Sequence, residues 1–244
     1  MRIKKAQSIY MEGNDTAVLL LHSYTSHTRD MKALAESIHQ SLGFTCFAPL
    51  YRGHGEEAEA LIPYTIDDWW EDSLESYQQL AKQYKQVFVI GLSVGGIFAL
   101  KLAQQFPIER VVVMSVPADK SPIQVKQRII DYAIRYKKLE NKSVEQIQDE
   151  LMKFEPLSMD SFERFQQFLL ETMSDLSVIK SPIAIYYGGR DDAIYEESAV
   201  EIAESVSSAL IDIKKFENSS HLMTLRKEKD RLYKQIIQFL SPVV

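Results

Sequence analysis

The sequence of 244 residues has little glycine and almost no cysteine. Average usage of about 7% predicts roughly 17 glycines, whereas the chain has nine. Glycine is needed where a side chain would clash, so we expect these few at such positions. Cys46 is the single cysteine, and one thiol forms neither an intramolecular disulfide nor a thiolate zinc cluster. A disulfide-stabilised fold is therefore excluded, and the sequence fits a reducing compartment, so we expect a cytoplasmic protein.

The chain also lacks a net positive charge and a long hydrophobic run. With 28 Lys and Arg against 34 Asp and Glu, its formal charge is −6, so no positive field exists to hold nucleic-acid phosphates. The basic segment 1–10 is not followed by an apolar run of signal-peptide length. The most apolar stretch, residues 87–103, contains Lys101 and three glycines, which favours a buried strand and helix over a membrane span. We expect a small-molecule partner, no nucleic acid and no membrane span; monomer and dimer both stay open.

Length and pattern predict one large α/β domain. A chain of this length forms one domain more readily than two of typical size. Short apolar runs without clean alternation indicate strands buried on both faces, and amphipathic segments between them indicate covering helices, as in a mostly parallel sheet. The expected strands are 17–21, 44–48, 87–90, 111–115, 183–187 and 211–214. The expected helices between and after them include 31–40, 69–84, 97–104, 198–206 and 226–239.

Residues 117–178 interrupt this alternation. They contain no convincing strand and are typical of consecutive helices, one of which begins after Ser143 with a capping box completed by Gln146. We therefore expect a core formed by residues 1–116 and 179–244, with residues 117–178 inserted as a small helical cap. Caps of this kind cover an active site and supply its apolar wall.

Seven glycines, from Gly53 onward, lie at or just beyond the ends of expected strands, where open α/β sheets bind ligands. The most informative group, Gly91-Leu92-Ser93-Val94-Gly95-Gly96, stands between a predicted strand and a predicted helix. A serine directed out of so sharp a turn brings the residues two positions away close together, so both must lack a large side chain. Gly91, Ser93 and Gly95 satisfy this G-x-S-x-G nucleophile elbow, which predicts Ser93 as the nucleophile.

A serine hydroxyl needs a base, and the base needs an orienting acid. With this elbow the acid and the histidine follow the serine in the chain, and of the five histidines only His221 does so. The acid is expected in the loop after strand 183–187, where Asp191 and Asp192 are adjacent. We favour Asp191, three residues after Gly188, with Asp192 as the alternative.

Acyl transfer also needs hydrogen-bond donors for the developing oxyanion. We expect them to be the backbone N–H of Val94, which follows the nucleophile, and that of Tyr24, in the loop after the first predicted strand. An apolar pocket for an acyl chain is expected near Tyr24, Ile123, Ile194 and Leu222.

With these features in place, the chain resembles the α/β-hydrolase superfamily, and more closely its small bacterial carboxylesterases and monoacylglycerol lipases. The resemblance runs through nearly the whole chain. Its points are Leu19-Leu20-Leu21-His22, Ala48-Pro49-Leu50-Tyr51-Arg52-Gly53-His54-Gly55, Asp67-Asp68-Trp69-Trp70, the elbow, Pro107-Ile108-Glu109, the Asp191 loop and Ser220-His221.

This resemblance implies a triad of Ser93, Asp191 and His221, oxyanion amides of Tyr24 and Val94, a small helical cap, no cofactor, no metal and ester substrates. It also implies that His22 and His54 brace loops through hydrogen bonds. One departure is Ser23, because the family pattern has glycine after the first histidine.

We therefore predict a serine carboxylesterase that hydrolyses esters of short to medium acyl chain, with monoacylglycerols among the candidate substrates. The same triad also serves thioesterases, amidases and carbon–carbon hydrolases, and these activities remain as alternatives. A non-catalytic ligand-binding protein is the third interpretation, for which Ser23 is the only sign.

Overall fold

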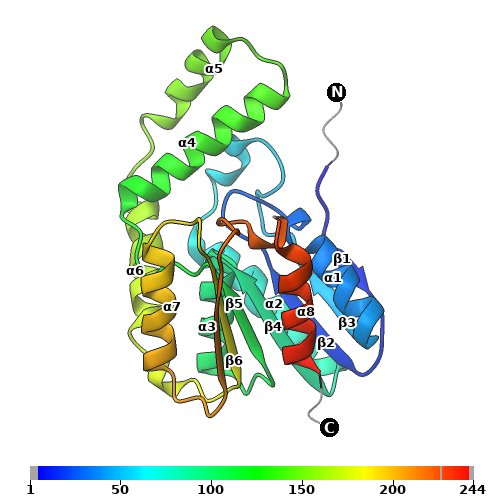
Figure 1. Ribbon diagram of the computed structural model, residues 1–244. Coiled ribbons are helices and arrows are strands. Elements are labelled where there is room, and N and C mark those ends of the chain that lie inside the picture. Colours follow the sequence, from blue (N-terminus) through cyan, green and yellow to red (C-terminus); the bar gives the residue numbers. More distant parts are fainter. Residues whose placement is uncertain (1–4, 226, 242–244) are drawn as a thin grey trace.

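The computed structural model describes residues 5–225 and 227–241, and within them seven strands form one sheet (Figure 1). The strands are β1 (Ile9–Met11), β2 (Thr16–Leu21), β3 (Thr45–Ala48), β4 (Gln86–Leu92), β5 (Val111–Met114), β6 (Ile183–Gly188) and β7 (Ile211–Phe216). Their order across the sheet is β1-β3-β2-β4-β5-β6-β7. Strand β1 is antiparallel to β3, and the other neighbouring pairs are parallel.

Helices cover both faces of this sheet. On one face lie α1 (Arg29–Leu42) and α8 (Lys229–Leu240), and on the other lie α2 (Ile66–Gln83), α3 (Val94–Gln105) and α7 (Ile194–Ser205). Because side chains alternate along a strand, Leu19 and Leu21 of β2 join the core on the α3 side, whereas Val18 and Leu20 join the core on the α1 side. Both faces are therefore buried, which explains the unbroken apolar runs.

The predicted α/β fold with its mostly parallel sheet is confirmed, and the six expected strands are present with ends shifted by up to two residues. Strand β1 was not predicted. It has three residues and is defined by its pairing with β3, Tyr10 lying opposite Phe47. Short 3-10 helices, η1 (Ala58–Leu61) and η4 (Met223–Leu225), lie in the loops after β3 and β7.

The segment between β5 and β6 consists of helices. It contains α4 (Pro122–Leu139), α5 (Val144–Leu151), η2 (Met152–Phe154), α6 (Asp160–Met173) and η3 (Leu176–Val178). The predicted capping box of Ser143 and Gln146 is present at the start of α5. Figure 1 shows α4 and α5 standing beyond the carboxyl ends of the strands, while α6 runs back along the body of the protein.

Ion pairs join this inserted segment to the rest of the protein. The buried Lys137 of α4 binds Glu59 of η1 at 2.6 Å and Glu150 of α5 at 2.7 Å. Arg164 of α6 binds Asp67 of α2 at 2.7 Å. The N-cap of α2 is Thr65, whose backbone N–H donates to Asp68, and Asp67 lies in the first turn of the helix.

No helix among the described residues is long and apolar enough to cross a membrane.

Candidate active site

Ser93 stands at the junction of β4 and α3. Its backbone angles are φ 57° and ψ −119°, a region that L residues rarely adopt, so the turn is strained. A Cβ at Gly91 would lie 2.0 Å from the Gly95 carbonyl oxygen, and one at Gly95 would lie 2.2 Å from the Leu21 carbonyl oxygen. Both glycines are therefore required by close approach, as the elbow pattern predicts.

Two loops at the carboxyl ends of β6 and β7 bring an acid and a base together. A Cβ at Gly188 would lie 2.4 Å from the Ser219 carbonyl oxygen, and the Arg190 amide donates to that same oxygen at 2.9 Å. This contact holds the two loops against each other. Asp191 Oδ2 then lies 2.9 Å from Nδ1 of His221.

Asp192, the alternative acid, makes a different contact. It is exposed, and its Oδ1 accepts from the backbone N–H of Ile194 at 3.4 Å, at the start of α7. The histidine contact is made by the neighbouring Asp191. The geometry therefore pairs His221 with Asp191, whereas Asp192 accepts a hydrogen bond from the first residue of α7.

The loop after β2 is held by buried polar side chains. Ser23 Oγ donates to Asp30 Oδ2 at 2.6 Å, and Ser26 Oγ donates to Asp30 Oδ1 at 2.7 Å. Asp30 is 2% exposed, and burial raises the pKa of its carboxyl while the Ser23 and Ser26 hydroxyls oppose that rise. Ser23 thus ties the loop to α1, which accounts for a side chain where the family pattern has glycine.

His22 connects the same loop to the loop after β3. Its Nε2 accepts from the Tyr51 amide at 3.3 Å, so the proton lies on Nδ1, which is 3.0 Å from the Ser23 carbonyl oxygen. His54 Nδ1 lies 3.1 Å from the Arg52 carbonyl oxygen. The predicted bracing role of both histidines is confirmed, and both are buried away from solvent.

The amides of Tyr24 and Val94 are available as donors. Within the described part of the chain, neither donates a hydrogen bond to another protein group. Val94 is the first residue of α3, where the backbone N–H has no partner inside the helix and the helix dipole favours negative charge. The two amides belong to adjacent strand ends, β2 and β4, which pair in the sheet.

A cavity of about 820 Å³ opens over these groups. Of the predicted site residues, it is lined by Ser93, Asp191, His221, Tyr24, Val94 and Leu222. Ile123 and Ile194 line neither this cavity nor the second one described below. Ile123 is 75% exposed, because the buried stripe of α4 consists of Val125, Ile129 and Ala133. Of the four residues predicted for the acyl pocket, Tyr24 lines both cavities, Leu222 lines the larger one, and Ile123 and Ile194 line neither.

A second, more apolar cavity of about 490 Å³ lies between η1, α2 and α6. Its apolar lining consists of Leu61, Ile62, Tyr64, Ile66, Trp69, Ile129, Leu157, Phe162 and Phe165. Tyr24 and Phe165 line both cavities, and their rings lie 5.1 Å apart. The sequence did not predict this contact, because the position of Phe165 beside Tyr24 depends on how α6 packs.

Tyr195 is the other residue that the sequence did not reveal. Its ring centroid lies 4.7 Å from that of His221, and it lines the larger cavity. The only available signal was an aromatic residue four positions after Asp191. Burial raises the pKa of its phenol, with the Asp191 carboxylate contributing in the same direction.

The chain matches the family described as "Serine aminopeptidase, S33" over residues 12–230. It belongs to this family and is an α/β-hydrolase. This α/β-hydrolase is 35% identical to a carboxylesterase of Bacillus subtilis, covering 99% of this chain and 98% of the relative. It is 26% identical to a thermostable monoacylglycerol lipase of a Bacillus species, covering 97% and 94%.

Among solved structures, the α/β-hydrolase fold matches that of a metagenome-derived lipolytic enzyme with a TM-score of 0.77. The two chains are 19% identical, and the match covers 98% of each. At that identity the likeness concerns the fold.

Proposed function

We propose that this α/β-hydrolase is a serine carboxylesterase, in which Ser93, His221 and Asp191 act as nucleophile, base and acid. The Ser93 hydroxyl attacks the ester carbonyl while Nε2 of His221 takes its proton. The tetrahedral oxyanion is stabilised by the amides of Tyr24 and Val94. The alcohol leaves with the proton from His221, and a water activated by His221 then releases the acid from Ser93.

The observation that carries this proposal is the 2.9 Å contact between Asp191 Oδ2 and His221 Nδ1 in the cavity that Ser93 also lines. This contact keeps the proton on Nδ1 and leaves Nε2 free to act as the base. The strained elbow holds Ser93 at the cavity, and the 35% identity to a carboxylesterase supports ester bonds as the target.

The substrate that we propose is an ester of short to medium acyl chain, including monoacylglycerols, as the second relative suggests. Residues 117–178 serve as the cap, with α4 forming the wall above the site and α6 fixing the segment to the body. The apolar cavity around Tyr24 and Phe165 receives the acyl chain. A cytoplasmic location remains part of the proposal.

The test is hydrolysis of p-nitrophenyl esters graded by chain length, by wild type and by Ser93→Ala. We expect wild type to favour short and medium chains, and Ser93→Ala to lose at least about 10³-fold in kcat. A thermal melt checks that the variant remains folded. Unchanged turnover in folded Ser93→Ala would refute the nucleophile, and cleavage confined to thioesters or amides would refute the substrate class.

A further inference from the structure

The larger cavity has a charged wall, which an ester with two apolar ends would not need. Four cations line it: Arg29, Lys120, Arg128 and Arg135. Three of them come from α4 or the turn before it, together with the neutral polar residues Gln124 and Gln127. From Gln124 to Leu139 the lining face of α4 extends about 22 Å. The inserted segment also supplies apolar side chains to this cavity, among them Val125 and Leu139. The second cavity is the more apolar of the two.

The carboxylates of this cavity already have partners. Asp30 accepts from two serine hydroxyls, and Asp191 contacts His221. Asp131 accepts from Gln127 at 2.9 Å, and Asp192 accepts from the Ile194 amide. Each of the four carboxylates that line the cavity therefore has a donor from the protein.

The cations of the cavity have no oppositely charged partner in the described part of the protein. Over the described residues, the side chains of Arg29, Lys120, Arg128 and Arg135 form no ion pair with a carboxylate, and the Arg128 guanidinium is a hydrogen-bond donor to the Tyr195 phenol. Elsewhere, Arg52 pairs with Asp68, Glu71 and Asp72. The acidic protein thus carries a group of unpaired cations in its catalytic cavity, and an unpaired cation in a partly enclosed site attracts an anion.

Two of these cations lie on the His221 side of the cavity. The Nζ of Lys120 lies 5.0 Å from the ring centroid of Tyr195, and that ring lies against His221. Burial lowers the pKa of the Lys120 ammonium, and Asp192 opposes this. The Arg128 guanidinium opposes the rise in the pKa of Tyr195, as expected for a neighbouring positive charge.

Catalytic chemistry decides which half of the substrate meets these cations. The leaving oxygen receives its proton from His221, so the alcohol part must lie beside that ring. His221 lines the charged cavity and does not line the apolar one. The acyl part stays on Ser93 near the Tyr24 amide, and Tyr24 borders the apolar cavity. The alcohol therefore extends into the charged cavity and the acyl chain into the apolar one.

We propose that the Lys120, Arg128 and Arg135 wall binds an anionic group, a carboxylate or a phosphate, on the alcohol part of the ester substrate. This inference rests on the proposed carboxylesterase function and adds a substrate class to it. The reaction is unchanged. The acyl–oxygen bond breaks, and the anionic alcohol leaves with the proton from His221. Water then hydrolyses the acyl-enzyme and releases the acid from Ser93. The anionic group contributes to substrate binding and takes no part in the bonds that form and break.

Three matched esters test the proposal: the butyrates of 4-hydroxybenzamide, of 4-hydroxybenzoate and of 4-hydroxyphenyl phosphate. The first is neutral, and the others place a carboxylate or a phosphate at the same position. We expect wild type to have kcat/KM about tenfold higher for at least one anionic ester than for the benzamide, because two or more cations gain a partner. About 1 M NaCl should reduce this preference. Preference for only one anionic ester identifies the anion.

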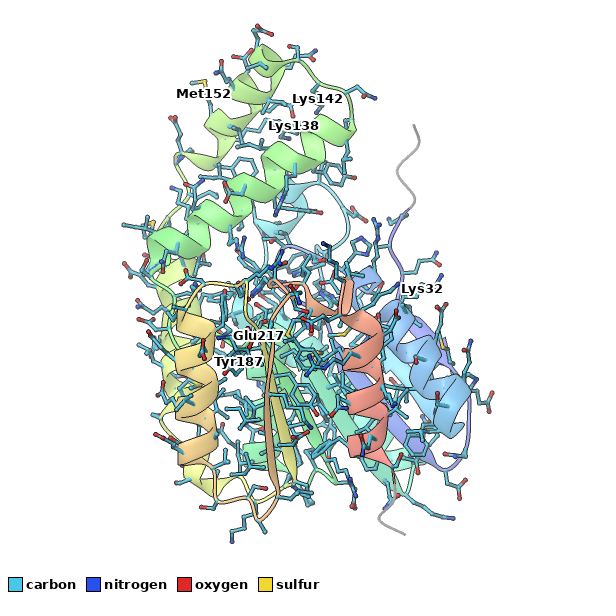
Figure 2. All side chains as sticks on the ribbon, viewed as in Figure 1. Lys32, Lys138, Lys142, Met152, Tyr187 and Glu217 are labelled. Atoms are coloured by element: carbon cyan, nitrogen blue, oxygen red, sulfur yellow. The ribbon has the colours of Figure 1, made fainter. Side chains whose placement is uncertain are left out.

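Variants show whether the wall causes the preference. Lys120→Gln/Arg128→Gln should lower kcat/KM for the anionic esters more than for the benzamide, chiefly through KM, so that the ratio falls toward one. Lys138→Gln is the matched control, because Lys138 is exposed on α4 and lines neither cavity. Figure 2 shows Lys138 at the α5 end of the inserted segment, away from the sheet. For Lys138→Gln, the ratio of kcat/KM for the anionic esters to kcat/KM for the benzamide should equal that of wild type.

The inference is overturned if wild type cleaves the benzamide as well as both anionic esters, or if the double variant lowers all three equally. Hydrolysis of p-nitrophenyl butyrate by the same preparations separates this failure from that of the proposed function. If p-nitrophenyl butyrate is cleaved in a Ser93-dependent manner while no anionic preference exists, only the substrate class is wrong. If wild type cleaves none of these esters, the carboxylesterase proposal fails and the inference fails with it.

Discussion

Single residues around the site are held by buried hydrogen bonds, and Ser23 is the clearest case. The family pattern has glycine here, yet Ser23 Oγ donates to the buried Asp30 at 2.6 Å. The next residue, Tyr24, carries one of the amides proposed for the oxyanion. The hydroxyl therefore fixes the backbone immediately before a catalytic donor, and a small displacement of such a donor weakens its interaction with the transition state.

Ser23→Ala should lower kcat for p-nitrophenyl butyrate about tenfold with little change in KM, because the Tyr24 amide loses its anchor. Ser26→Ala is the matched control. It removes the other hydroxyl on Asp30, so it should cost a similar 1 kcal/mol or so of unfolding free energy, but it lies two residues beyond Tyr24. Steady-state kinetics and urea unfolding measure both effects. Equal kcat values for the two variants would contradict a positioning role for Ser23.

The positions of helices and strands could be predicted from local sequence more fully than the way these elements pack and pair. The apolar and β-branched runs predicted six strands. Burial on both faces leaves a direct signal in the inner ones, whereas the edge strand β7, which is largely unburied, was marked by its isoleucines. Strand β1 left none, because three residues at a sheet edge form a strand only through pairing with β3. Ile123 shows the limit on helices: residues 117–178 were predicted to be helical, but which side chains α4 buries depends on its packing, and its buried apolar stripe runs through Val125 and Ile129.

The whole molecule determines which loops meet. Ser93, Asp191 and His221 could be predicted from order and spacing, because parallel strands bring their carboxyl ends to one edge. Tyr195 beside His221 and Phe165 beside Tyr24 could not, because these contacts depend on how α7 and α6 pack. The charged wall was also hidden, since arginines on a helix are usually solvated and nothing local shows that α4 stands over the site.

The stability of the fold should depend on pH through its buried histidines. Burial lowers the pKa of His54 to about 4 and that of His22 well below 6.5, whereas both titrate near 6.5 in an unfolded chain. Between these values the unfolded state binds more protons, so the free energy of unfolding falls as the pH falls. From His54 alone, the loss between about pH 7 and about pH 4.5 is on the order of 2 kcal/mol.

Urea unfolding of wild type and His54→Gln across this pH range measures that loss. The variant has no imidazole at position 54 to protonate, so its free energy of unfolding should fall less steeply on acidification. Its lower stability at neutral pH does not enter the comparison, because the slope with pH is what is measured. Identical slopes for the two proteins would contradict the assignment.

The central claim is that Ser93 is a nucleophile activated by His221. It is tested most directly by labelling the protein with an alkyl fluorophosphonate and mapping the modified peptide by mass spectrometry. We predict one covalent adduct, located on Ser93, and loss of this adduct in His221→Ala protein that remains folded. An adduct on another residue, or no adduct on wild-type protein that hydrolyses p-nitrophenyl butyrate, would contradict the account.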